Sequence, residues 1–326
     1  MSKSWSVVST IDEPKPLVLA FVSYYLALGA EEVHIYLDRA SEETRDIQEI
    51  LHTRSEVSCT ICDEAYWQQN AAKQPAHIPR RQRINATNAY RVTKSDWLLH
   101  CDADEYLGKV EAVLAALETI DSENDYVLVP VAERVRTEED DPSALFSEFF
   151  RRPVSRAHHD QTIALYEPYG EMLQNNVAGH TLGKSFYRTG RSMTVGVHTL
   201  NEAGVTGRVG ARLNFQALFH VDDLTERSFI KKLQQRIVRG HGPEKTQAPA
   251  RKAQLQFVKD HMGAPETLSA FYRGLKKITP DQAQTLHDNG WLMRYEIDPL
   301  PSIAQYFPEA RVALTVDEFD SLLELT

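Results

Sequence analysis

The feature that most constrains the fold of this sequence is a regular alternation of strand-like and helix-like segments over its first 131 residues. The strand-like segments are rich in β-branched and aromatic residues and span 6–11, 32–38, 57–63, 97–102 and 126–131. The segments between them have helical patterns and span 17–28, 41–53, 80–95 and 110–120. Strands that alternate with helices in this way predict an α/β fold, an αβα sandwich with a mostly parallel central sheet.

The pattern changes after this region. Residues 134–200 form loops rich in Pro, His and Gly, with short strands predicted at 182–188 and 193–200. The remainder is mainly helical, with helices predicted at 225–240, 250–263, 266–277 and 315–325. We therefore expect a first domain at 1–223 and a helical C-terminal extension at 224–326 that packs on it.

Composition narrows the class of protein. The formal net charge of −10 argues against a nucleic-acid partner, which would favour a basic surface. Three cysteines are too few for a disulfide framework and indicate a reducing compartment. The sequence opens without a signal-peptide pattern, and the longest apolar stretch, 17–30, is shorter than the roughly 20 residues of a membrane span. We expect a cytoplasmic enzyme without a transmembrane segment, and peripheral membrane contact stays open.

Acidic residues gather at the end of the strand-like segment 97–102, in "DWLLHCDADEYLG". Residues two apart on an extended chain face the same side, so Asp102 and Asp104 can direct their carboxylates toward one point. Converging carboxylates repel unless a cation lies between them, and hard oxygen ligands suit Mg²⁺ or Mn²⁺. The pattern therefore predicts a divalent-metal site shared with substrate phosphates. A solvated loop in which these residues act as caps is the alternative.

The same stretch resembles the W-x-x-x-x-D-x-D-E-[FY]-L signature of nucleotide-sugar glycosyltransferases of the family 2 type, especially the branch close to family 92. The N-terminal segment 9–43 also resembles that branch, although Asp12-Glu13 stands where Asn-Glu is usual and Tyr25 replaces a histidine. Later elements of the family are matched by "KSFYR", "GVHTL" and "LFHVDDLTERSFIKK". The central motif is specific, whereas a bare D-x-D is not.

The resemblance implies a fold of the glycosyltransferase A type and an inverting enzyme that uses Mn²⁺ or Mg²⁺. Its donor would be a nucleotide-diphosphate sugar, with a UDP-sugar favoured, and its acceptor a hydroxyl of a glycan or small molecule. Carried over by position, Thr10 and Glu13 would lie near the base and ribose, and Asp38 would face the uracil or ribose. Asp102 would contact the ribose or a water-bridged metal, and Asp104 would ligate the metal directly.

Three further residues are candidates around the donor. Arg83 lies on the helical segment 80–95, and an arginine fork suits a diphosphate, although a solvated helix face explains it equally well. Glu105 is expected to fix the acidic loop. Lys184 either meets a phosphate or is an exposed lysine of a strand.

Histidine and carboxylate candidates complete the predicted site. His198 and His220 each close a strand-like segment, and the resemblance implies that a histidine serves as the third protein ligand to the metal; a hydrogen-bonded structural histidine is the alternative. Inversion requires a carboxylate base within hydrogen-bond reach of the acceptor hydroxyl. Glu133, Asp222 and Asp223 are candidates, and the sequence does not rank them.

Two other functions remain open at this stage. A nucleotidyltransferase acting on a sugar phosphate also combines a sheet with metal-binding carboxylates, but it normally carries a Gly-rich phosphate loop, and "STIDEPKP" contains no glycine. A non-catalytic carbohydrate-binding scaffold with a relict site is the third interpretation. The presence of both Asp102 and Asp104 argues against the scaffold.

Overall fold

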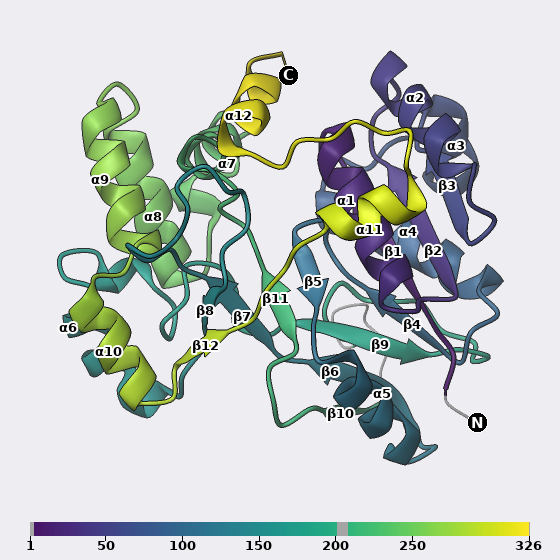
Figure 1. Cartoon of the computed structure of the whole chain (residues 1–326), viewed down its shortest axis with the longest axis horizontal. Helices are drawn as coiled ribbons and strands as arrows, with labels where there is room; N and C mark the ends of the chain where they lie inside the picture. Colours follow the sequence, from purple (N-terminus) through teal and green to yellow (C-terminus); the bar gives the residue numbers. More distant parts are fainter. Residues whose placement is uncertain (1–2, 201–207, 326) are drawn as a thin grey trace. The chain divides into compact units, whose positions relative to one another are not determined.

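The computed structural model describes residues 3–200 and 208–325 and divides the chain into two compact units (Figure 1). Unit 1 comprises 1–130, 182–218 and 299–312, and unit 2 comprises 131–181, 219–298 and 313–326. The units are interleaved along the chain, so their limits differ from the predicted boundary at residue 223. The assignment of a function to 1–223 and of an extension to 224–326 stays a prediction.

Unit 1 contains a seven-stranded sheet in the order β10-β6-β9-β4-β1-β2-β3. Its strands are β1 (Trp5–Ile11), β2 (Glu32–Leu37), β3 (Val57–Ile61), β4 (Trp97–His100), β6 (Asn124–Val129), β9 (Lys184–Arg188) and β10 (Val209–Arg212). Only β9 is antiparallel to its neighbours within this sheet as described. The prediction of an α/β fold with a mostly parallel central sheet is confirmed.

Helices cover both faces of this sheet. They are α1 (Lys15–Ala27), α2 (Glu42–Leu51), α3 (Glu64–Ala71), α4 (Ile78–Val92), α5 (Val110–Thr119) and α11 (Leu300–Tyr306), and a short strand β5 spans Glu105–Leu107. Side chains alternate along β1, so Trp5 contacts Tyr25 of α1 whereas Val8 packs with Ala86 of α4 on the opposite face. Helix α11 returns from late in the sequence to lie beside α1 (Figure 1).

The long apolar stretch 17–30 is explained by this packing. Leu17 to Leu26 of α1 are all buried within unit 1, which accounts for a helix with almost no polar face. Ser23 is the buried polar exception, and it accepts a hydrogen bond from Ser302 of α11 (3.0 Å). In the described residues, no helix is both long enough and apolar enough to span a membrane.

Unit 2 combines a small sheet with a group of helices. Strands β12 (Leu292–Arg294), β8 (Phe149–Arg151), β7 (Val131–Arg134) and β11 (Leu218–His220) lie next to one another in that order. The helices are α6 (His159–Leu165), α7 (Glu226–Val238), α8 (Pro249–Asp260), α9 (Pro265–Lys276), α10 (Pro280–Asp288) and α12 (Val316–Leu325). Three-residue 3₁₀ turns occur at Arg156–His158, Gly170–Met172 and Pro243–Lys245. Phe229, Leu255 and Phe271 belong to the apolar core of this unit.

One predicted strand is wrong. Residues 193–200 form an irregular segment, because their backbone groups bond to side chains and not to a neighbouring strand. The amide of Val195 donates to Thr87 Oγ1 of α4 (3.0 Å), and the carbonyl of Gly196 accepts from Tyr187 (3.1 Å). A Cβ at Gly196 would lie 1.8 Å from the carbonyl oxygen of Thr199, so the tight turn requires glycine.

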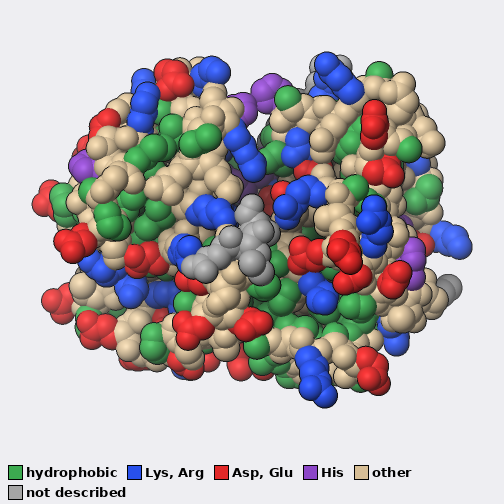
Figure 2. Space-filling view, turned by 90° about the horizontal axis from the view of Figure 1, so that it is seen from above, with side chains coloured by type: hydrophobic (Ala, Val, Ile, Leu, Met, Phe, Trp, Pro, Cys, Tyr) green, Lys and Arg blue, Asp and Glu red, His purple; other side chains and the backbone are tan. Residues whose placement is uncertain are grey.

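Acidic and basic side chains are interspersed over the face of the molecule seen in Figure 2. Some form exposed ion pairs, such as Lys3 with Asp96 and Lys259 with Glu244. Such pairs add little to the free energy of unfolding, because water screens them and ordering the side chains costs entropy.

Candidate functional site

The predicted donor residues lie at the carboxyl edge of the unit 1 sheet. Strand β1 has β2 on one side and β4 on the other, so the direction of winding reverses between β1 and β4. In open α/β sheets ligands bind outside the carboxyl ends of the strands at such a point. Thr10 lies near the end of β1, and Asp102 follows β4.

Asp102 is held by three residues of unit 1. Its Oδ1 accepts from Gln82 Nε2 of α4 (2.6 Å), and its Oδ2 accepts from Lys184 Nζ (2.7 Å). Its backbone amide donates to Glu105 Oε2 (2.8 Å). Glu105 is fully buried, and its hydrogen bond to the Asp102 amide supports the prediction that it fixes the acidic loop. Because β9 is antiparallel to β4, Lys184 at its start reaches the edge at which β4 ends.

The charges at this edge stabilise one another. Burial and the neighbouring Asp104 raise the pKa of Asp102, but the Lys184 ammonium outweighs them and holds that pKa below its ordinary value. Burial lowers the pKa of Lys184, but the carboxylates of Asp102 and Glu105 outweigh it and hold that pKa above its ordinary value. The nearby His100 is fully buried; burial, together with Lys184, lowers its pKa to about 4. The edge therefore contains a charged lysine and a neutral histidine.

The predicted metal ligands are only partly brought together. In residues 3–200 and 208–325, no three His, Cys, Asp or Glu side chains form a group that could hold a metal ion. His198 belongs to unit 1 and donates through Nδ1 to the carbonyl of Gly183 (2.8 Å). His220 belongs to unit 2 and stacks with His180, with ring centroids 6.0 Å apart. Asp102 and Asp104 remain a two-carboxylate set, which fits Mg²⁺ or Mn²⁺ that keeps waters and binds substrate phosphates.

A cavity of about 470 Å³ lies beside the ends of β2 and β3. It is lined by Asp38, Arg39, Ala40, Cys62, Asp63, Glu64, Trp67, Gln68, Ala72, Lys73 and Gln74. Asp38 is buried at 6% exposure, and its Oδ2 pairs with Arg81 (2.6 Å). Its Oδ1 is also buried and makes no hydrogen bond within the part of the chain that the structure describes. Burial raises the pKa of Asp38 despite the attraction of Arg81.

Polar and aromatic side chains order the region next to this cavity. Asn85 Nδ2 of α4 donates to Thr10 Oγ1 (3.0 Å), and Tyr66 OH donates to Asn85 Oδ1 (2.6 Å). The ring of Tyr66 packs against those of Tyr36 (6.0 Å) and Trp67 (5.0 Å). The predicted residues Thr10 and Asp38 are thus connected to a rigid set of side chains on α3 and α4.

For two residues predicted to bind the sugar donor, Glu13 and Arg83, the structure gives their exposure but does not test the predicted contacts. Glu13 follows β1 and is partly exposed. Arg83 on α4 is partly buried, and its Nε makes no hydrogen bond within the described residues. The arginine that α4 places on a predicted carboxylate is Arg81, which sequence analysis did not single out. Contacts of Glu13 with a ribose and of Arg83 with a diphosphate stay predictions.

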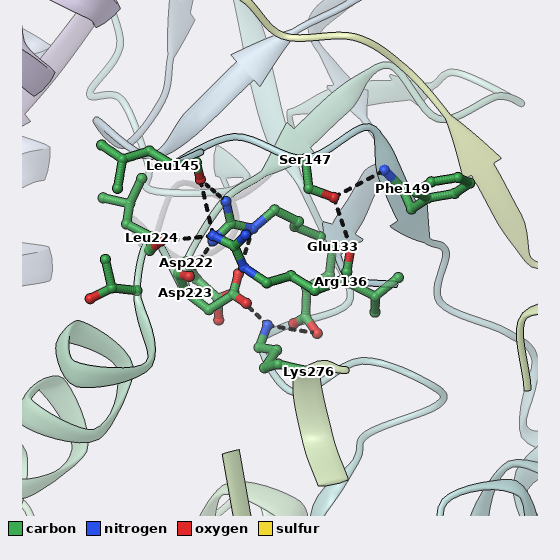
Figure 3. Close-up of polar contacts among 12 residues, drawn as sticks. Glu133, Arg136, Leu145, Ser147, Phe149, Asp222, Asp223, Leu224 and Lys276 are labelled. Atoms are coloured by element: carbon green, nitrogen blue, oxygen red, sulfur yellow. Dashed lines mark hydrogen bonds and ion pairs between the residues drawn. The ribbon is translucent and has the colours of Figure 1, made fainter. Parts of the chain in front are cut away.

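Of the three carboxylates predicted as bases, Glu133 and Asp222 share a lysine in unit 2. Figure 3 shows the Lys276 ammonium between them, with Nζ 3.0 Å from Glu133 Oε1 and 2.5 Å from Asp222 Oδ1. Glu133 Oε1 also accepts from Arg151 Nη2 and from the amide of Ala178 (2.9 Å). Burial raises the pKa of Glu133, but Lys276 and Arg151 outweigh it and hold it well below its ordinary value.

Asp223 lies in the same buried network. Its Oδ1 accepts from Arg134 Nε (2.9 Å), and both side chains are fully buried. Tyr272 OH donates to its Oδ2 (3.3 Å). Glu133 and Asp223 thus lie in buried ion pairs, and their role as a base stays a prediction. Asp222, with a side chain 12% exposed, is the most accessible of the three.

The low pKa of Glu133 predicts a pH dependence of stability. A carboxylate whose pKa is lowered by folding stabilises the protein above its unfolded-state pKa, near 4.5, and loses that contribution as the pH falls through this value toward the folded-state pKa. At about pH 7, Glu133→Gln should lower the free energy of unfolding by about 3 kcal/mol or more, because it leaves Arg151 and Lys276 under-compensated. Urea unfolding of both proteins down to about pH 3 should show this difference shrinking. A difference that stays constant with pH would contradict the assignment.

Comparison with known proteins supplies no family. No protein-family model matches the chain, and no curated protein sequence matches it. Among solved structures, the chain is similar to TarS 1-349 from S. aureus, with 14% identity and a TM-score of 0.35 over 98% of this chain and 83% of that one. It is also similar to HddC from Yersinia pseudotuberculosis, with 10% identity and a TM-score of 0.37 over 72% and 99% of the two chains.

A third similar structure is glucosyl-3-phosphoglycerate synthase from Mycobacterium tuberculosis in complex with Mn²⁺, uridine diphosphate and phosphoglyceric acid. The identity is 13% and the TM-score 0.34, over 73% of this chain and 79% of that one. Likeness of this degree leaves the chemistry to be argued from the residues themselves.

Proposed function

We propose that the chain is a divalent-metal-dependent glycosyltransferase that moves a sugar from a UDP-sugar to a hydroxyl of a glycan or small-molecule acceptor. One observation carries the proposal: a cavity with a buried carboxylate oxygen of Asp38 lies on the same unit as the two-carboxylate edge formed by Asp102 and Asp104. A nucleotide diphosphate presents both a base with N–H groups and a pyrophosphate that binds divalent ions. The two features of unit 1 match these two chemistries.

The cavity is assigned to the base. Asp38 lines the cavity, its Oδ1 is a buried acceptor without a hydrogen bond among the described residues, and Arg81 holds its other oxygen, so the carboxylate cannot rotate freely. The imide N–H of uracil is a donor of the kind that such an oxygen needs, because an unsatisfied buried acceptor costs free energy. Thr10, whose Oγ1 accepts from Asn85, would contact the base or ribose, as the family resemblance implies.

The acidic edge is assigned to the diphosphate. Asp104 would ligate a divalent ion, with Asp102 contributing through water. When bound, such an ion neutralises the charge that develops on the departing nucleoside diphosphate. The chain's own contribution is to hold Asp102 still through Gln82 and Lys184. Pre-oriented groups of this kind need no rearrangement when charge develops.

Acceptor activation is assigned to Asp222. An inverting transfer requires a carboxylate that removes the proton of the attacking hydroxyl. Asp222 is the most accessible of the three candidates, although its Oδ1 pairs with Lys276, whereas Glu133 and Asp223 lie in fully buried ion pairs. His198 and His220 remain the candidates for a third protein ligand to the metal.

The assignment of the base cavity is tested by calorimetric titration with UDP, GDP and dTDP in the presence of Mn²⁺. Of the three nucleotides, UDP should bind most tightly to the wild type. Asp38→Asn should weaken UDP binding by about 10- to 100-fold. The amide of the variant would give its oxygen to Arg81 and face the imide N–H with its own NH₂ group. Asp46→Asn, at an exposed position of α2, is the matched control and should bind UDP normally. Equal UDP affinity in all three proteins would contradict the assignment.

A further inference from the structure

We propose that Lys184 is a positioning residue whose ammonium group neutralises Asp102 and Glu105 in place of a metal ion. The carboxylate of Asp102 is therefore not available to bind a metal ion directly. The nucleotide part of this inference rests on the proposed function, whereas the metal part does not. Sequence reasoning left Lys184 open between a phosphate contact and an exposed lysine. The structure shows a fully buried side chain between two carboxylates of its own unit.

The distances define which carboxylate is held. Lys184 Nζ lies 2.7 Å from Asp102 Oδ2 and 3.6 Å from Glu105 Oε2. The first is a charge-assisted hydrogen bond, and the second is a longer ion pair. Gln82 Nε2 takes the other oxygen of Asp102 at 2.6 Å. Both oxygens of Asp102 therefore already have a donor, and a divalent ion would have to compete with an ammonium for one of them.

The burial of the lysine explains why it stays in place. A buried ammonium is costly unless it is paired, and Lys184 is paired twice. Withdrawing it from Asp102 would leave both the lysine and Glu105 poorly compensated inside unit 1. The remaining neighbours, Cys101 and His100, cannot take over that role because neither carries a carboxylate.

Two consequences follow for the edge. Asp104 becomes the carboxylate on which a divalent ion depends, and Asp102 acts mainly by shaping the loop. Part of the negative charge that would repel a diphosphate is neutralised before any metal arrives. Nucleotide binding should therefore persist partly in the absence of metal.

The inference is tested by titrating the protein with Mn²⁺ in the absence of nucleotide. Electron paramagnetic resonance measures the concentration of free Mn²⁺ at each step. Lys184→Met releases Asp102 and should raise the affinity for Mn²⁺ by about 10-fold or more, because a second carboxylate becomes available and a nearby positive charge is removed. Lys94→Met removes an exposed lysine of the same unit and should leave the affinity unchanged. Mn²⁺ should also raise the melting temperature of Lys184→Met more than that of the wild type.

A second variant guards against misfolding. Lys184→Met combined with Glu105→Gln removes one charge of each sign, and its Mn²⁺ affinity should also exceed that of the wild type. An affinity in Lys184→Met and in the double variant that equals or falls below the wild-type value would overturn the inference. Failure of the wild type to bind UDP would count against the proposed function and leave the Mn²⁺ comparison intact. Binding of UDP by the wild type in EDTA, lost in Lys184→Met, would support both.

Discussion

Asp104→Asn should reduce sugar transfer by at least about 100-fold, the loss typical when one preorganised partner of the developing charge is removed. Asp104 lies at the same edge as Asp102, and it is partly exposed. Asp102 is already held by Gln82 and Lys184, so Asp104 carries most of the dependence on metal. The measurement is the rate of UDP release from a UDP-sugar at saturating Mn²⁺, together with the free energy of unfolding.

The free energy of unfolding of Asp104→Asn should distinguish a loss of metal-dependent activity from misfolding. The charge of Asp104 raises the pKa of Asp102, which means that the two carboxylates repel one another in the folded protein. Removing that charge relieves this repulsion, so a large loss of the free energy of unfolding would indicate misfolding as the cause of lost activity. Glu111→Gln, at an exposed position of α5, is the control and should keep full activity. Full activity in Asp104→Asn would show that the metal, if one is used, does not depend on this carboxylate.

Arg134→Met should destabilise the protein by about 3–5 kcal/mol, the cost of leaving a buried charge without its partner. Arg134 and Asp223 are both fully buried, and Nε lies 2.9 Å from Oδ1. The same guanidinium donates to the carbonyl of Leu145, so the variant also removes one donor from a buried acceptor. Denaturant unfolding followed by circular dichroism measures the change.

Two further variants show whether burial is the cause. Arg294 pairs with Glu148, but its side chain is 73% exposed, so Arg294→Met should produce no resolvable change. Arg134→Met combined with Asp223→Leu removes both charges and should recover part of the lost stability, because apolar replacement of a whole buried pair is often neutral. If Arg134→Met behaved like Arg294→Met, the buried pair would contribute nothing.

Local periodicity was sufficient to predict much of unit 1. The alternation of segments placed β1 to β4, β6 and the helices between them to within a few residues, because each segment carries its own pattern of apolar side chains. Helix α3 was missed, although Asp63 at its start is an N-cap that accepts from the amide of Tyr66 (2.8 Å). Its short length gave too few turns for a helical period to be recognised.

Contacts between residues far apart in the chain could not be predicted from the sequence. The antiparallel insertion of β9 between β4 and β6 brings Lys184 to Asp102, which precedes it by 82 residues, and no local pattern signals this contact. In unit 2, Glu133 pairs with two cations, Arg151 and Lys276. Neither is adjacent to Glu133 in the sequence. The sequence therefore singled out these carboxylates as candidates, but it did not indicate the cations that pair with them in the structure.

The sequence of helix α4 contains a pattern of polar residues from which the binding edge could have been predicted. Arg81, Gln82 and Asn85 lie within one turn of each other, and they reach Asp38, Asp102 and Thr10 respectively. A helix face that carries three polar residues toward three strand ends indicates a binding edge. The prediction for Arg83 rests on the suitability of an arginine fork for phosphate, and its contact with a diphosphate stays a prediction.

Product analysis tests the central claim most directly: that the carboxyl edge of the unit 1 sheet binds a nucleotide-diphosphate sugar and releases its nucleotide. Purified protein is incubated with UDP-sugars and Mn²⁺, and the nucleotide products are separated by chromatography, with the Asp102→Asn, Asp104→Asn double variant alongside. We predict release of UDP by the wild type and its loss in the double variant. Release of pyrophosphate, or equal UDP release by both proteins, would contradict the claim.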